Sequence, residues 1–194
     1  MKPNINTKLS IHLLKSFEWT IKLLLERQQH TWKSLNINYD YPNIERIYID
    51  YNGFRISCHK ILQSFKQPLY HKHRWPAVFK QLKGSYTMGI THSPHEISSI
   101  EAQYLPTLAK FEINEGSYYE MTQTDTLHYI ETNQSAFLGY PNEEQLDSLH
   151  SYSIMLTELN CLYKEDRKES LTTKLEPLSN KRIQELRQIF ADLL

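Results

Sequence analysis

The chain has 194 residues, and its 22 Lys and Arg balance its 22 Asp and Glu, so the formal net charge at pH 7 is zero. Because no basic excess is present to follow a phosphate backbone, we expect no nucleic-acid partner. The apolar runs are shorter than a membrane span and the N-terminus lacks a signal-peptide core, so we expect no membrane partner and a cytoplasmic protein. Apolar residues make up 40% of the chain, which is enough for the core of a single domain over residues 1–194.

In chain order, the first predicted element is helical and covers residues 8–35. Leu14, Phe17, Ile21 and Leu24 recur at three- and four-residue spacing, which is the period of one helix face. The pattern fits one helix, or two helices broken near His30.

The pattern then changes to that of strands over about residues 44–160. Residues 44–51 and 54–61 are rich in β-branched and aromatic side chains, and Asn52-Gly53 between them is a strong hairpin signal. Similar short runs, separated by turn residues, predict strands near 71–83, 85–90, 108–113, 118–121, 127–130 and 149–156.

The chain closes with a predicted helix over residues 179–193, with Ser179 as its N-cap. A helix, many short strands and a final helix indicate a mainly β fold, an antiparallel sandwich or barrel rather than an alternating parallel α/β fold. The two cysteines, Cys58 and Cys161, are too few for a disulfide framework.

Histidines give the strongest chemical signal. His71 and His73 are two residues apart, so on a strand both imidazoles point to the same face. His128, on a later predicted strand, supplies a third imidazole. Three neutral imidazoles on one side of a metal leave open positions for substrate, water or dioxygen. The sequence therefore predicts a mononuclear metal site.

These residues carry a resemblance to a family. The series His71, His73, Gly84, Gly116 and His128 resembles the two sequence motifs of the cupin superfamily, which bind a metal inside a small jelly-roll barrel. The resemblance implies a cupin-type antiparallel jelly-roll barrel flanked by the two helices. The common first motif has a glutamate ligand, where this chain has Ala77 and Val78.

A three-histidine site without that carboxylate is similar to that of the cysteine dioxygenase-type cupins. This resemblance implies Fe(II), with Zn, Mn and Ni as alternatives, and an oxidoreductase that adds dioxygen to a small thiol or amino-acid-like acid. It also implies that Arg46 binds the substrate carboxylate. It implies further that His150 and Tyr152 form a catalytic H-x-Y pair near the metal, with Tyr152 as a hydrogen-bond donor beside it. The cysteine that cross-links to this tyrosine in the animal enzymes has no counterpart here, since Ala77 and Val78 occupy the nearby positions.

Trp75 and Tyr86 are aromatic residues at strand spacing, and we expect them to line the barrel interior around a small-molecule substrate. Two alternatives to a dioxygenase stay open, namely a non-catalytic ligand-binding cupin and a metal-dependent isomerase-type cupin. Cupins often pair through strand edges, so the resemblance also implies a homodimer.

Overall fold

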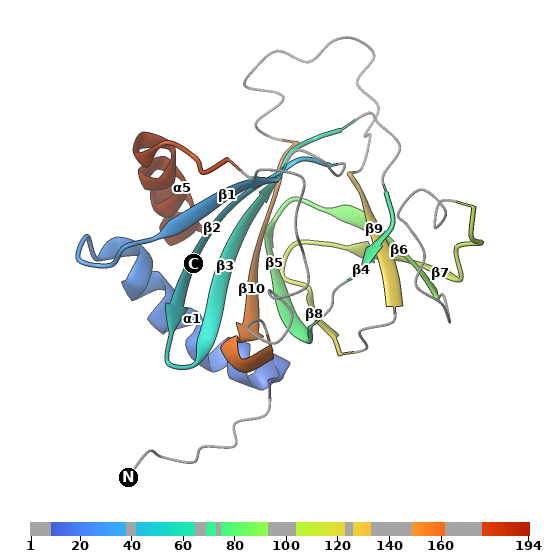
Figure 1. Cartoon of the computed structure of the whole chain (residues 1–194), viewed down its shortest axis with the longest axis horizontal. Coiled ribbons are helices and arrows are strands. Elements are labelled where there is room, and N and C mark those ends of the chain that lie inside the picture. Colours follow the sequence, from blue (N-terminus) through green and yellow to red (C-terminus); the bar gives the residue numbers. More distant parts are fainter. Residues whose placement is uncertain are drawn as a thin grey trace.

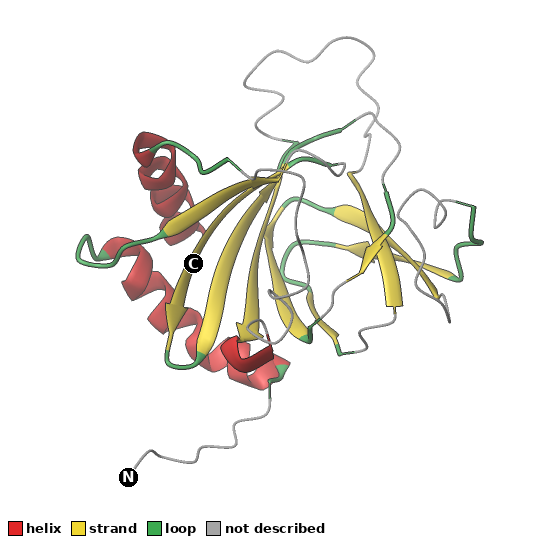
Figure 2. Cartoon of the chain, in the orientation of Figure 1, coloured by secondary structure: helices red, strands yellow, loops and turns green. Residues whose placement is uncertain are grey.

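The structure is a computed structural model that describes residues 9–37, 42–64, 69–72, 75–92, 104–122, 126–132, 149–161 and 176–194. Helix α1 (Ile11–Glu26) comes first and helix α5 (Asn180–Leu193) last, with the strands between them (Figures 1 and 2). The strands are β1 (Lys33–Ile37), β2 (Ile44–Tyr51), β3 (Phe54–Ile61), β4 (His71–Lys72), β5 (Ala77–Lys83), β6 (Tyr86–His92), β7 (Ala109–Ile113), β8 (Tyr118–Met121), β9 (Thr126–Thr132) and β10 (Ser151–Glu158). Within these ranges, neither helix is long and apolar enough to cross a bilayer.

The strands form two antiparallel sheets. The six-stranded sheet has the order β1-β2-β3-β10-β5-β8, and the four-stranded sheet has the order β4-β9-β6-β7. The order β3-β10-β5-β8 facing β4-β9-β6-β7 is that of a jelly roll, in which the chain passes repeatedly from one sheet to the other. The predicted fold class, a mainly β jelly-roll barrel with a helix at each end, is therefore confirmed.

The six-stranded sheet is covered on both faces. Ile47, Cys58 and Ile154 belong to an apolar cluster that also contains Leu14 of α1 and Phe190 of α5, so the helices cover the outer face (Figure 1). Ile61 belongs instead to a cluster that contains buried residues of the four-stranded sheet, Met88 and Ile130 among them. Because side chains alternate along a strand, these two clusters fix which residues face the barrel interior.

The first helix is shorter than predicted. It begins after Ser10, whose side chain accepts a hydrogen bond from the Leu13 amide, and it ends at Glu26 rather than near residue 35. Residues 33–37 form β1, an edge strand that pairs with β2 over Ile44–Tyr48. The prediction extended the helical pattern of residues 14–24 over this segment. The strand is defined by its pairing with β2, which the sequence does not show.

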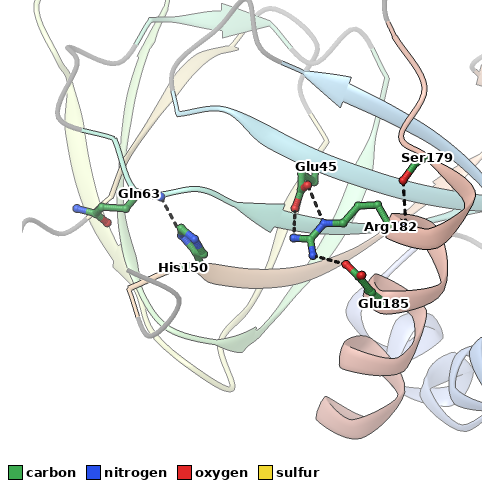
Figure 3. A network of polar contacts seen from close by, with 6 residues as sticks. All are labelled: Glu45, Gln63, His150, Ser179, Arg182 and Glu185. Carbon is green, nitrogen blue, oxygen red and sulfur yellow. Dashed lines mark hydrogen bonds and ion pairs between the residues drawn. The ribbon is translucent and has the colours of Figure 1, made fainter. Parts of the chain in front are cut away.

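The strand predicted near residues 71–83 is two strands in the structure, because β4 joins the four-stranded sheet and β5 joins the six-stranded sheet. The predicted hairpin and the cap of the last helix agree with the structure. The turn between β2 and β3 lies at Asn52 and Gly53, both with positive φ, as the Asn-Gly pair predicts. Ser179 is the N-cap of α5, and its hydroxyl accepts a hydrogen bond from the Arg182 amide at 3.2 Å (Figure 3).

Candidate metal centre

His71 and His128 come together on the inner face of the four-stranded sheet. They are direct cross-strand partners on β4 and β9, and their ring centres lie 4.3 Å apart with the ring planes at 62°. His128 has the same strand parity as Ile130, which packs in the interior cluster, and its side chain is 1% exposed. The sequence motif thus places two imidazoles side by side within the barrel.

The ring orientations indicate which nitrogen atoms would hold a metal. Nδ1 of His71 lies 3.4 Å from the Leu69 carbonyl oxygen, and Nδ1 of His128 lies 3.5 Å from the Met88 sulfur. A proton on Nδ1 leaves the ring lone pair on Nε2, as in many protein metal sites where the second nitrogen is held by a neighbour. Nε2 is therefore the expected ligating atom of each ring.

The separation of the rings fits a shared ion. Two imidazoles at right angles around one metal, each nitrogen about 2.1 Å from it, have ring centres roughly 4.5 Å apart. The observed 4.3 Å is close to this value. His73, the third predicted ligand, lies outside the described residues, and within those residues no set of three His, Cys, Asp or Glu side chains forms a complete metal site.

A band of polar side chains crosses the inner face of the six-stranded sheet. Arg46 on β2 is the strand partner of His59 on β3, His59 is the partner of Ser153 on β10, and Ser153 is the partner of Gln81 on β5. His59, Ser153 and Gln81 are buried, at 5%, 2% and 0% exposure. Arg46 is half-buried and has the same strand parity as Ile44, which packs against the interior cluster, while Asp50 pairs with Arg55 at 2.8 Å. The role of Arg46 as the partner of a substrate carboxylate stays a prediction.

His59 was not recognised from the sequence as a site residue. Its signal was present, because Phe54, Ile56 and Cys58 occupy one face of β3 and so place His59 on the other. The sequence alone did not show that this other face is the barrel interior.

Tyr86 lies in the interior, as predicted. It is fully buried at the start of β6, and its hydroxyl lies 2.7 Å from the Tyr119 hydroxyl of β8. Burial raises the pKa of the Tyr86 hydroxyl and also that of Tyr119, so both phenols stay protonated at neutral pH. The pair joins the two sheets through a neutral hydrogen bond. Trp75, expected beside it, is half-buried between β4 and β5.

Tyr152 does not lie beside the histidines. Its side chain packs in the outer cluster, edge-on to Phe190 of α5 with ring centres 5.7 Å apart, and the Lys60 ammonium lies 5.8 Å from its ring centre. The prediction that Tyr152 lies near the metal is therefore wrong, because its side chain points to the outer face of the six-stranded sheet. The residues of β10 that share the inward parity are Ser151, Ser153, Met155 and Thr157.

His150 has a structural position at the start of β10. Its Nδ1 accepts a hydrogen bond from the Gln63 amide at 3.1 Å, as Figure 3 shows. Its carbonyl oxygen crowds Gly84, which has φ of 72°, and a Cβ there would come within 2.8 Å of that oxygen. The glycine that ends the histidine motif is thus required by the turn and by the approach of the His150 backbone.

Comparisons with known proteins return structural likeness only. No protein-family model matches the sequence, and no curated protein matches it. Among solved structures, hydroxypropylphosphonic acid epoxidase from S. wedmorenis shares 8% identity at a TM-score of 0.42, covering 64% of this chain and 55% of its own. A protein of unknown function from Vibrio parahaemolyticus shares 7% identity at a TM-score of 0.39, covering 66% and 98%.

A third similar structure is a cupin-family protein with a double-stranded β-helix fold from Methanocaldococcus jannaschii. It shares 9% identity at a TM-score of 0.36, covering 71% of this chain and 90% of its own. The assignment of the fold as a jelly roll rests on the strand order and pairing described above.

Proposed function

We propose that this protein is a mononuclear metal-binding cupin in which His71, His73 and His128 hold the ion. The observation that carries the proposal is the contact of the His71 and His128 rings, at 4.3 Å, on the inner face of the barrel. His128 is buried and His71 is half-buried beside it, and neutral imidazole nitrogens are ligands of Fe, Zn and related metals.

The reaction that we propose is a dioxygenation at Fe(II). Bound Fe(II) with open positions supplies the electrons that allow dioxygen to react with an organic substrate. The chain's own contribution is to hold the two ligand rings, since the Leu69 carbonyl oxygen lies beside Nδ1 of His71 and the Met88 sulfur beside Nδ1 of His128. Thiols and amino-acid-like acids are the first substrates to assay, with Arg46 as the proposed partner of a carboxylate.

One observation favours a second candidate function. Tyr152, the residue proposed from sequence as a hydrogen-bond donor beside the metal, packs against α5 instead. A site that lacks this donor fits a cupin that binds a ligand without turnover. Oxygen uptake coupled to substrate loss, measured across a panel of thiols and small acids, decides for the enzyme, whereas tight binding without uptake decides for the ligand-binding protein.

The metal proposal is tested by the metal content of the purified full chain. We expect about one ion per chain in the wild type and a loss of roughly tenfold or more in affinity for His71→Ala, His73→Ala and His128→Ala. The matched control is His12→Ala, since His12 is an exposed residue of α1. Circular dichroism establishes that each variant is folded, and His128→Gln replaces His128→Ala if that variant unfolds.

Full metal retention in folded His71→Ala and His128→Ala would contradict the proposal. The homodimer implied by the resemblance stays a prediction, and sedimentation of the same samples checks it.

A further inference from the structure

Strand β7 ends the four-stranded sheet and has one open side. It pairs with β6 on its inner side, and within the described residues no strand pairs with its other side (Figure 1). The outer edge of β1 in the six-stranded sheet differs, because the Asn36 amide there donates to the Glu176 carbonyl. The open side of β7 can therefore pair with a further strand.

Large apolar side chains are exposed at and just before β7. Of the four large apolar residues that the described part of the chain exposes, Tyr104, Leu108 and Phe111 belong to this stretch, and the fourth is Trp19 on α1. Phe111 is 47% exposed in the middle of the strand, on the face that also carries the buried Ile113. Exposed apolar residues gathered at an open strand edge indicate a contact surface.

The opposite face of β7 carries two charges of opposite sign. Lys110 and Glu112 flank Phe111 and point to the outer face of the sheet, where the Lys110 ammonium lies 3.8 Å from the Glu131 carboxylate. Charged side chains on an edge strand usually oppose association. Here their order makes the strand self-complementary, because two antiparallel β7 strands centred on Phe111 place Lys110 of each copy opposite Glu112 of the other.

Charge also selects the register of such a pair. Each side chain stays on its own face only if the strands slip by an even number of residues. A slip of two residues in one direction places Lys110 opposite Lys110, and in the other direction Glu112 opposite Glu112, and like charges directly opposite each other are destabilising. The centred register avoids both. It can form whichever backbone groups of β7 face outward, since antiparallel pairs alternate between hydrogen-bonded and non-hydrogen-bonded ones.

We propose that a second copy of this chain pairs with β7 through its own β7, antiparallel and centred on Phe111, so that the two four-stranded sheets form one continuous sheet. Phe111 borders a cavity of about 500 Å³ between β7 and β8, which leaves room for the ring of the second copy. A pair of five-residue strands is a small interface, so the dimer is weak and depends on concentration. The proposal gives a definite interface to the homodimer expected above.

The test is an exchange of charges, followed by sedimentation of the full chain over about 5–500 µM. Lys110→Glu places like charges opposite each other at two symmetry-related positions, and so does Glu112→Lys. We expect each variant to weaken the dimer roughly tenfold or more. Lys181→Glu, the same charge change at an exposed residue of α5, is the matched control and should leave the dimer unchanged.

Mixing the two variants makes the test specific to this register. A chain with Lys110→Glu and a chain with Glu112→Lys have opposite charges at both facing positions, so we expect the mixture to associate at least as tightly as the wild type. The double variant Lys110→Glu/Glu112→Lys should likewise restore association, because each exchanged charge again faces its opposite.

A disulfide measures the register directly. The background is Cys161→Ser, which removes the half-buried cysteine and keeps the buried Cys58. Phe111→Cys then places two thiols opposite each other, with Cα atoms about 4.5–5.5 Å apart, and we expect a covalent dimer on mild oxidation. Leu108→Cys is the control, because its two copies are separated by six residues of strand, or about 20 Å, and should not cross-link.

A wild type that stays monomeric throughout this concentration range would overturn the proposal. A mixture of the two charge variants that associates no better than either variant alone would also overturn it, as would equal cross-linking of Leu108→Cys and Phe111→Cys. Circular dichroism establishes that each variant is folded, and the exposed Lys110–Glu131 pair contributes little to stability. Because no metal ligand is changed, the metal content of the histidine variants is a separate result.

Discussion

At the scale of single residues, the close approach of Gly89 and Tyr129 shows how tightly the outer face of the four-stranded sheet is packed. The two residues are cross-strand partners on β6 and β9, and the Tyr129 ring lies over Gly89. A Cβ on Gly89 would come within 2.2 Å of two ring atoms. The ring is itself held edge-on by Tyr70, with ring centres 4.9 Å apart, so it has little freedom to move away.

We predict that Gly89→Ala destabilises the fold by about 1–3 kcal/mol, since the added methyl displaces a packed ring. Urea unfolding of the full chain measures the change. In Tyr129→Ala the ring is gone, so adding Gly89→Ala there should cost less than it does in the wild type. Strictly additive costs in this double-mutant cycle would contradict the interpretation.

Also at the residue scale, the candidate metal centre shows that residue types alone did not predict which side chains lie next to one another. His71 and His128, singled out from the sequence as metal ligands, are cross-strand partners on the neighbouring strands β4 and β9. Their role as ligands stays a prediction. Tyr152 was misplaced because β10 is buried on both sides, so its alternation does not reveal which face is the interior.

At the scale of elements, the two helices hold each other at their ends. Arg187 of α5 donates to the Leu25 carbonyl at 2.6 Å and to the Arg27 carbonyl at 2.8 Å, where the last turn of α1 leaves backbone oxygens without helical partners. In return, Lys22 of α1 donates to the Ala191 carbonyl of α5 at 3.0 Å. Positive side chains at helix C-termini also favour the helix dipole.

We predict that Arg187→Ala lowers the free energy of unfolding by about 2–3 kcal/mol, because Arg187 is 4% exposed and its loss leaves carbonyls of α1 unsatisfied. Chemical denaturation compares it with Lys181→Ala, an exposed residue of the same helix whose loss should cost no more than about 0.5 kcal/mol. Equal costs for the two variants would show that the end of α1 does not depend on Arg187.

A second contact between elements joins α5 to the six-stranded sheet. Arg182 donates to both carboxylate oxygens of Glu45 on β2, at 2.9 and 2.6 Å, and to Glu185 on its own helix (Figure 3). The contact fixes α5 against the sheet whose inner face carries Arg46 and His59. The helices thus pack against the six-stranded sheet, which lies opposite the sheet that carries His71 and His128.

At the scale of the whole molecule, burial of weak acids links stability to pH. Burial raises the pKa of the Cys58 thiol, and it likewise raises the pKa of Tyr86 and Tyr119. In the unfolded chain the thiol loses its proton near pH 9 and the phenols near pH 10, whereas the folded protein keeps these protons. Above pH 9 the unfolded state therefore binds fewer protons than the folded state, and stability falls as pH rises.

We predict that the free energy of unfolding is independent of these groups below about pH 8 and declines from pH 9 upward. Urea titrations at a series of pH values measure this slope. Tyr119→Phe, which keeps the ring stacked on Phe79 and removes one ionisable hydroxyl, should flatten the decline above pH 10. A slope unchanged by Tyr119→Phe, or a stability that rises with pH in this range, would contradict the assignment.

The sequence by itself determined the elements whose signals are local. The Asn52-Gly53 hairpin needs positive φ and the Ser179 cap needs a side-chain acceptor, so these two features were predicted correctly. The sequence also singled out His71 and His128, which are cross-strand partners, while their role as metal ligands stays a prediction. Only the tertiary structure decided that residues 33–37 join a sheet edge, that Tyr152 faces α5 and that His59 faces the interior. The physical reason is that strand alternation gives two faces, while the choice between them depends on which partner, helix or opposite sheet, buries each one.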